Sequence, residues 1–347
     1  MSPGDTPAAA GRGETLPRAD AVFEGGGVKA IALVGAAAAI RDAHYIFENL
    51  AGTSGGAIVA GLLAAGLSGE QIRDKLKELD YLKFEDARGL ARDGWTGKAL
   101  HAARKFGIYA GEFFEEWFGG LLAETGRTRF GDIPTGSDDE RFKYRFQAIA
   151  SDLTDRKLLV LPGSLRDFGF DPDEFSIARA VRMSISIPGF FEPVKLIDND
   201  GLPHYIVDGG LLSNYPVWLL DDGGPNPPWP TFGFKLMGPN ARKLTEGARH
   251  EIRNVFDFAA ELVKTMNEAH DRYHISVSAG DFQRTIPIPT TVMLPTGPKA
   301  ITTTDFKITP EESQLLYDGG WEAAKAFLAT WDFESWKARY RCRTPAP

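Results

Sequence analysis

The sequence predicts an α/β protein whose central sheet is mainly parallel. Residues 21–23 form a short apolar run that ends at a cluster of glycines, and a strongly helical stretch follows. The same pattern recurs at residues 44–50, which have the apolar and aromatic content of a strand and precede the turn GTSGG and a helical stretch that stops at Gly66. Successive strand, turn and helix units are typical of parallel sheets covered by helices.

The rest of the chain continues this pattern. Ser68 is a candidate N-cap for a surface helix over residues 68–79. Residues 111–126 place apolar side chains at helical spacing, and Pro188 interrupts a helix that begins at residue 176. Further strands are expected at residues 144–150, 157–161, 191–197, 204–207 and 231–237, and further helices at residues 248–273 and near residues 310–331.

Composition and charge exclude several classes of protein. The chain has 39 Lys and Arg against 47 Asp and Glu, for a formal net charge of −8, so it offers no basic surplus for general nucleic-acid binding. Cys342 is the single cysteine, which rules out an intramolecular disulfide and zinc sites built on several thiolates. Residues 24–30 match neither the dinucleotide fingerprint nor the P-loop ending, and we expect no metal and no cofactor.

Domain organisation is expected to be simple. Residues 1–19 predict a flexible tail, and residues 20–347 a single domain, with a core at about 21–217 and a C-terminal extension at about 231–347 packed on it. The tail lacks the features of an export signal, and the apolar run at residues 28–41 is too short to span a membrane. We therefore expect a cytoplasmic protein, with peripheral membrane contact as an option.

The turn after the second predicted strand carries a candidate nucleophile. Gly52, Ser54 and Gly56 fit the G-x-S-x-G pattern, in which a serine on a sharp strand-to-helix turn presents its hydroxyl at the edge of the sheet. The glycines are needed because the turn is cramped. The alternative is a helix whose first turn is capped by Ser54 or Thr53.

The earlier glycine cluster is a candidate oxyanion hole. Successive glycine amides at the start of a helix converge on a developing negative charge. In a parallel sheet, the turns that follow neighbouring strands lie at the same edge, which would place Gly26 and Gly27 beside Ser54.

Two arrangements would supply a base for Ser54. In the first, Asp208 is the acid of a triad whose histidine is His250, His270 or His274. In the second, Asp208, which ends a predicted strand and precedes two glycines, accepts the serine proton directly in a partly dry site.

Three motifs, in this order along the chain, resemble those of the patatin-like phospholipases. Residues 25–30 resemble their glycine-rich oxyanion loop, except that Ala30 replaces the usual glycine. Residues 52–56 match their nucleophile elbow, and residues 208–210 match their D-G-[G/A] motif. Residues 184–194 and 109–117 also resemble segments of that family.

The resemblance implies a three-layer α/β/α fold and a Ser-Asp dyad without a catalytic histidine. Ser54 would be the nucleophile and Asp208 the base. The resemblance also implies roles for the other motif residues. The backbone amides of the oxyanion hole would belong to Gly25, Gly26, Gly27 and Gly55. The residues that support the motifs would be Lys29, Gly52, Gly56, Gly209 and Gly210.

The implied activity is hydrolysis of fatty-acyl esters, of the phospholipase A or lysophospholipase type, through an acyl-serine intermediate. The implied partner is a phospholipid or another acyl-ester lipid. Three alternatives stay open: acyl transfer to a lipid or alcohol acceptor, an esterase with a Ser-His-Asp triad, and a lipid-binding protein without turnover.

Two aromatic segments are candidates for lipid contact. The first is a stripe of four residues that either forms an acyl-binding wall or lid or packs as an ordinary core face. The second combines aromatic and basic side chains and either anchors at an interface or forms a docked helix. The first comprises Phe113, Phe114, Trp117 and Phe118, and the second Trp331, Phe333, Trp336, Lys337, Arg339, Tyr340, Arg341 and Arg343.

Overall fold

Two strand, turn and helix units open the fold, as the sequence predicts. In the computed structural model, which describes residues 16–80, 83, 106–221, 223–238, 280–303 and 305–341, strand β1 (Arg18–Phe23) leads through a 3-10 turn into helix α1 (Ala30–Asp42). Strand β2 (Ile46–Thr53) then leads into α2 (Gly55–Ala64). Strand β1 begins at Arg18, so regular structure extends two residues into the predicted tail.

The remaining elements include those that the sequence predicts, several of them with changed limits, and others, such as β3, that it does not predict. They are α3 (Gly69–Glu78), β3 (Gly107–Tyr109), α5 (Glu112–Thr125), β4 (Phe146–Asp152), β5 (Lys157–Leu161), α6 (Ile177–Ser184), β6 (Gly189–Phe191), β7 (Val194–Ile197), β8 (Pro203–Asp208), β9 (Thr231–Met237), β10 (Thr285–Pro289), β11 (Thr291–Leu294), β12 (Gly297–Ala300), α8 (Pro310–Leu328) and α9 (Phe333–Tyr340). The strand expected at residues 191–197 is divided into β6 and β7, because β6 pairs with β3 and β7 with β8. The helix expected at residues 248–273 lies outside the described residues.

The central sheet is mixed and mostly parallel. Its strand order is β10-β9-β1-β2-β4-β8-β7, with β5 also paired to β4. The first five strands are parallel neighbours, whereas β8, β7 and β5 run antiparallel to theirs. In the register of β1 and β2, Phe23 lies opposite Gly52, so the glycine cluster and the serine turn emerge side by side at the carboxyl edge of the sheet.

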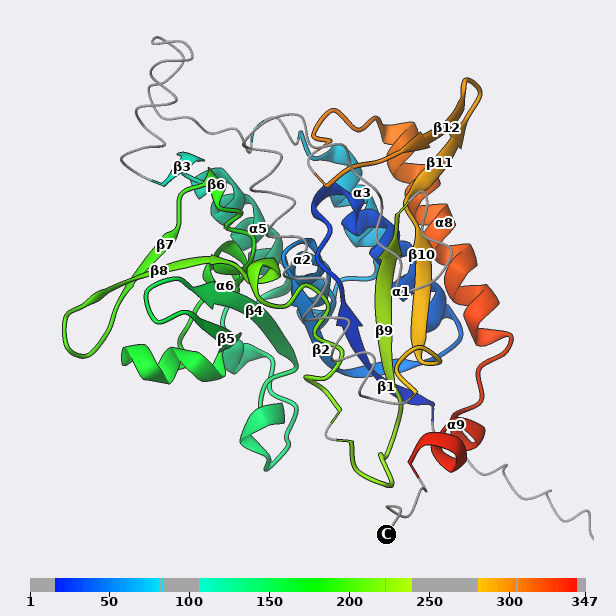
Figure 1. Cartoon of the computed structure of the whole chain (residues 1–347), viewed down its shortest axis with the longest axis horizontal. Coiled ribbons are helices and arrows are strands. Elements are labelled where there is room, and N and C mark those ends of the chain that lie inside the picture. The colour runs from blue at the N-terminus through cyan, green and yellow to red at the C-terminus, as the bar shows by residue number, and fades with distance from the viewer. Residues whose placement is uncertain are drawn as a thin grey trace, which may run out of the picture.

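Helices flank the sheet, and the main core lies between them and it (Figure 1). Alternate residues of β1 point to opposite faces: Ala21 and Phe23 join the main core with α1, α2, α6 and α8, while Val22 joins a smaller cluster with Ala51 and Leu220. Helices α1 and α8 approach closely through glycines. A Cβ on Gly320 would overlap the backbone oxygen of Ala32, so only glycine fits that contact.

Candidate active site

Ser54 occupies a strained turn between β2 and α2. Its backbone has φ of 51° and ψ of −124°, in the left-handed half of the map that L-residues seldom adopt. A Cβ on Gly52 would overlap the backbone of Gly56, and a Cβ on Gly56 would overlap the carbonyl oxygen of Phe23. Ser54 occupies the N-cap position, but its side chain makes no capping hydrogen bond. The hydroxyl therefore does not cap helix α2.

The backbone amide of Ser54 is hydrogen-bonded to a side chain that the sequence analysis did not place in the site. Ser54 N donates to Ser184 Oγ at 2.9 Å, and Ser184 Oγ donates to the carbonyl oxygen of Ile149 at 2.6 Å. Ser184 is fully buried at the end of α6. A chain of two hydrogen bonds therefore joins the serine turn to β4 and α6.

Asp208 ends β8 and faces this turn. Its Oδ1 accepts a hydrogen bond from Gly210 N at 2.7 Å, and its Oδ2 has no partner with full hydrogen-bond geometry among the described residues. Burial raises the pKa of Asp208 to about 6, and the Ser54 hydroxyl and the Gly210 amide oppose part of that rise. The serine hydroxyl thus lies close enough to the carboxyl group to favour its charged form.

The glycine loop divides into amides that are already engaged and amides that are not. Gly25 N donates to Asn214 O at 2.9 Å, and Val28 N donates to Thr303 O at 3.1 Å. Within the described residues, the amides of Gly26, Gly27 and Gly55 have no hydrogen-bond partner. Because Gly25 is engaged, it is not available as the donor that the sequence suggested.

The free amides of the two turns lie close together. A Cβ on Gly55 would come within 2.8 Å of Gly27 N, so the glycine loop packs directly on the start of α2. Gly27 and Gly55 therefore lie side by side, each at the N-terminal end of a helical segment, where negative charge is favoured.

The loop is braced by residues that the sequence analysis missed. Glu24 Oε1 accepts from Lys235 Nζ at 2.6 Å, and Glu24 Oε2 accepts from Leu236 N at 2.6 Å. Asn214 Nδ2 donates to Gly25 O at 3.3 Å. Nearby, Thr53 Oγ1 donates to the carbonyl oxygen of Ser213 at 3.0 Å, so residues 213–214 join the elbow to the glycine loop. The only local signal was that Glu24 directly precedes the glycines and Asn214 closely follows Gly210.

Comparison with known proteins identifies the family of the chain. The family model of patatin-like phospholipases matches residues 21–221, a segment that includes Ser54, Asp208 and both glycine turns. The chain belongs to the patatin-like phospholipase family. Membership supports lipid hydrolase activity in a broad sense.

The similarity to two relatives covers nearly the whole chain. The chain is 37% identical to the uncharacterized protein YqhO of Bacillus subtilis over 314 residues, or 90% of this chain and 99% of YqhO. It is 26% identical to the uncharacterized protein R571 of Acanthamoeba polyphaga mimivirus, over 87% of this chain and 91% of R571. The crystal structure of VipD from Legionella pneumophila has a similar fold, with a TM-score of 0.52 at 16% identity, covering 91% of this chain and 67% of VipD.

One departure from the patatin-like pattern has a simple structural basis. Ala30 has φ of −56° and ψ of −23°, which is right-handed helical, so a side chain is tolerated where the family usually has glycine. Lys29, the last residue of the 3-10 turn, is half-buried. Gly209 needs to be small, because a Cβ there would overlap the carbonyl oxygen of Ile149.

Four of the six histidines are candidates for a role in a site. His250, His270 and His274, the candidates for a triad, lie outside the described residues. His204 lies on β8, where its Nδ1 is 2.7 Å from Asp152 Oδ2 and its Nε2 is 3.3 Å from Asp198 Oδ2.

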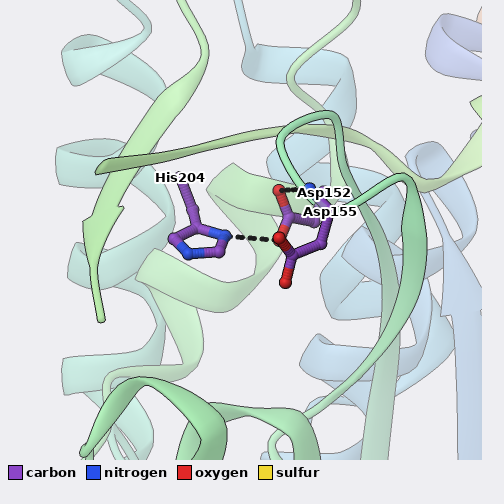
Figure 2. Close-up of side chains that lie close together, drawn as sticks. All are labelled: Asp152, Asp155 and His204. Atoms are coloured by element: carbon purple, nitrogen blue, oxygen red, sulfur yellow. Dashed lines mark hydrogen bonds and ion pairs between the residues drawn. The ribbon is translucent and has the colours of Figure 1, made fainter. Parts of the chain in front are cut away.

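The cluster of His204, Asp152 and Asp155 has the composition of a small metal site, and Figure 2 shows the imidazole pointing at Asp152. Both ring nitrogens, however, already contact carboxylates. Burial opposes a charge on His204, but the hydrogen bonds with Asp152 and Asp198 outweigh it and raise the imidazole pKa. A raised pKa extends to higher pH the range in which the imidazole carries a charge. The two contacts join β8 to the end of β4 and to the turn after β7.

The two aromatic segments pack against the body. Phe114 and Phe118 are fully buried, and Phe113 and Trp117 pack partly buried against the same core, which supports the core alternative for the stripe. In the C-terminal segment, Trp336 is buried and its Nε1 donates to Gly280 O at 2.9 Å, as expected for a docked helix. Arg343 lies outside the described residues. No helix in the described part of the chain is long and apolar enough to cross a bilayer.

Proposed function

We propose that the protein is a lipid acyl hydrolase of the phospholipase A or lysophospholipase type, with Ser54 as nucleophile and Asp208 as base. The observation that carries this proposal is the convergence on Ser54 of a buried carboxyl group with a raised pKa and a set of unengaged glycine amides. Family membership supplies the substrate class, a fatty-acyl ester of a lipid.

In the proposed reaction, Asp208 removes the proton from Ser54 Oγ as that oxygen attacks the ester carbonyl carbon. The amides of Gly26, Gly27 and Gly55 then donate to the oxyanion of the tetrahedral intermediate. When the intermediate collapses, the bond to the alcohol breaks and Asp208 returns its proton to the leaving oxygen. Water attacks the acyl-serine by the same route, the fatty acid leaves, and the proton returns to Ser54 Oγ.

Burial gives Asp208 its strength as a base. An aspartate in water, with a pKa near 3.8, has little affinity for the serine proton, whereas a pKa of about 6 brings that affinity nearer to what proton transfer at neutral pH requires. At pH 7 most of the carboxyl groups remain ionised and able to accept the proton.

The contacts of Ser184 and Asn214 suggest positioning roles. Ser184 fixes the amide of Ser54 and so the direction of the hydroxyl, while Asn214 holds Gly25 and thereby the loop whose next two amides would donate to the oxyanion. Neither side chain needs to touch the substrate to affect the rate.

The experiment is a lipid substrate screen that compares the wild type with Ser54→Ala, together with labelling by a fluorophosphonate probe. We expect the probe to label Ser54, and Ser54→Ala to lose both labelling and ester hydrolysis, by roughly 10⁴-fold or more in kcat. Ser68→Ala, which removes a remote N-cap hydroxyl, is the matched control and should retain activity. Unchanged hydrolysis by Ser54→Ala would refute the proposal.

A further inference from the structure

The β11–β12 hairpin projects from the end of the sheet that carries the candidate site. Strand β11 begins two residues after β10 ends, and β10 is parallel to the strands that lead to the glycine loop. Figure 1 shows the hairpin extending beyond the neighbouring elements, above α8. It therefore lies at the carboxyl edge of the parallel strands, on the same side as Ser54.

The two faces of this hairpin differ in chemistry. Met293 pairs with Pro298 across the ladder, and both are exposed, with Met293 69% accessible. Ala300, on the same face, is exposed as well. On the inner face Val292 is buried, and Lys299, the one charged residue of the segment 291–300, binds Glu312 Oε1 at 2.7 Å. The outer face thus carries Met293, Pro298 and Ala300 beside Thr291, and no charged residue of the hairpin.

The exposed apolar residues of the other hairpin, Ile197 and Leu202, lack this combination. Ile197 and Leu202 flank the β7–β8 turn, but Asp198 and Asp200 lie between them. That turn is also at the opposite end of β8 from Asp208. Acidic groups beside these apolar residues disfavour contact with a lipid surface. Because the turn lies at the other end of β8, contact there would not bring the candidate site to the lipid.

The hairpin is joined to the oxyanion loop by a short covalent path. After β12, Ile301 is buried and donates its amide to Thr290 O at 3.0 Å, which closes the base of the hairpin. Two residues later, Thr303 O accepts from Val28 N, and a Cβ on Gly27 would overlap that carbonyl group. Any molecule that binds the hairpin is therefore held close to the glycine loop.

We propose that the outer face of the β11–β12 hairpin is the surface on which this protein docks to a lipid aggregate. Met293, Pro298 and Ala300 enter the boundary between head groups and acyl chains, and the carboxyl edge of the sheet is thereby brought to the lipid. The inference rests on the proposed function, since it assumes a lipid substrate. The binding is apolar, because the inserted face carries no charge.

The test measures binding to phosphatidylcholine vesicles by cosedimentation, with Ser54→Ala as the background so that no substrate is consumed. Met293→Asp should weaken vesicle affinity about tenfold, because it removes apolar contact and places a carboxylate at the interface. Leu202→Asp is the matched control, a comparably exposed leucine on the other hairpin, and should bind as the parent does. Raising the ionic strength should change the parent's affinity little.

A second measurement follows turnover with Ser54 restored. The ratio of vesicle hydrolysis to hydrolysis of a soluble short-chain ester should fall about tenfold in Met293→Asp and stay constant in Leu202→Asp. Pro298→Asp repeats the test from the opposite strand, and equal melting temperatures show that a variant has folded. Hydrolysis that survives Ser54→Ala refutes the proposed function, whereas the binding comparison does not depend on turnover.

Two results would overturn the docking proposal. One is equal vesicle affinity for Met293→Asp and Leu202→Asp. The other is a change of oligomeric state in Met293→Asp without a change in vesicle binding, which would assign the face to a second copy of the chain.

Discussion

Asp208 combines a buried carboxyl group with few hydrogen bonds to stabilise its charge. Because its folded pKa of about 6 lies above the ordinary value of 3.8, we expect kcat/KM to rise with pH and to level off above about pH 6. The measurement is a pH–rate profile on a neutral soluble ester. An acid limb near pH 4 would show that Asp208 is not the ionising group, or that its charge is far better solvated than the burial implies.

The same shift has a consequence for stability. Since the folded state holds the Asp208 proton more tightly than the unfolded state does, the favourable contribution is complete below pH 3.8 and is lost as the pH rises through about 6. Asp208→Asn should therefore raise the melting temperature at pH 8 while abolishing turnover. No gain in melting temperature at pH 8 would argue against a costly buried charge.

Ser184 offers a test of positioning at a distance from the reacting atoms. Ser184→Ala leaves the Ser54 amide and Ile149 O without their partner, and we expect kcat to fall roughly 10- to 100-fold with KM little changed. Ser184→Thr restores a hydroxyl and should recover part of the loss. Ser151→Ala is the control, a buried serine whose Oγ has no hydrogen-bond partner among the described residues. Equal losses in kcat for both alanine variants would contradict the assigned role.

At the scale of elements, the bridge around His204 joins three segments of the antiparallel half of the sheet. It links β8 to Asp152 at the end of β4 and to Asp198 in the turn after β7. Because the folded pKa of His204 lies above the unfolded value of 6.5, its stabilising contribution is complete below that value and declines as the pH rises through the folded pKa.

We therefore expect His204→Gln to lower the melting temperature more at pH 6 than at pH 9. Comparing each variant with the wild type at the same pH removes the contribution of Asp208, which is common to both proteins. A loss that is the same at both pH values would indicate a neutral imidazole. Added divalent cations that raise the melting temperature of the wild type but not of His204→Gln would instead support a metal site.

The elements differ in how far the sequence could define them. The predicted limits of β5 and β9 match the structure, because turn residues bound both strands on either side, and Ser68 is the N-cap of α3, as its position suggested. The division between β6 and β7 was missed because it depends on pairing with β3 and β8. Ser54 and Asp208 could be predicted as site residues because their neighbouring glycines are local signals, whereas Ser184 reaches Ser54 across 130 residues of chain.

At the scale of the whole molecule, the C-terminal part is packed on the N-terminal helices. Helices α1 and α8 meet where a side chain at Gly320 would overlap the backbone of Ala32. We expect one cooperative unfolding transition, as for a single domain over residues 20–347. Gly320→Ala should lower the midpoint temperature of this transition and reduce the free energy of unfolding by about 1–3 kcal/mol, because helix α8 is forced away from α1.

Gly319→Ala is the matched control for this contact. Its Cβ would meet only Pro289 Cγ, at 3.7 Å, and alanine favours the helix, so stability should be unchanged or slightly higher. Differential scanning calorimetry measures both variants. Two separate transitions in the wild type, with only one affected by Gly320→Ala, would show that the C-terminal part unfolds on its own.

Three braces of the glycine loop come from residues beyond the segment that identifies the family. That segment ends at residue 221, whereas Lys235 and Leu236 hold Glu24, and Thr303 holds Val28. A protein shortened to the matched region would keep every motif residue but lose these three contacts. A fragment engineered to keep these contacts must therefore extend past Thr303. The segment by which the family is recognised is shorter than the part of the chain that holds the glycine loop in place.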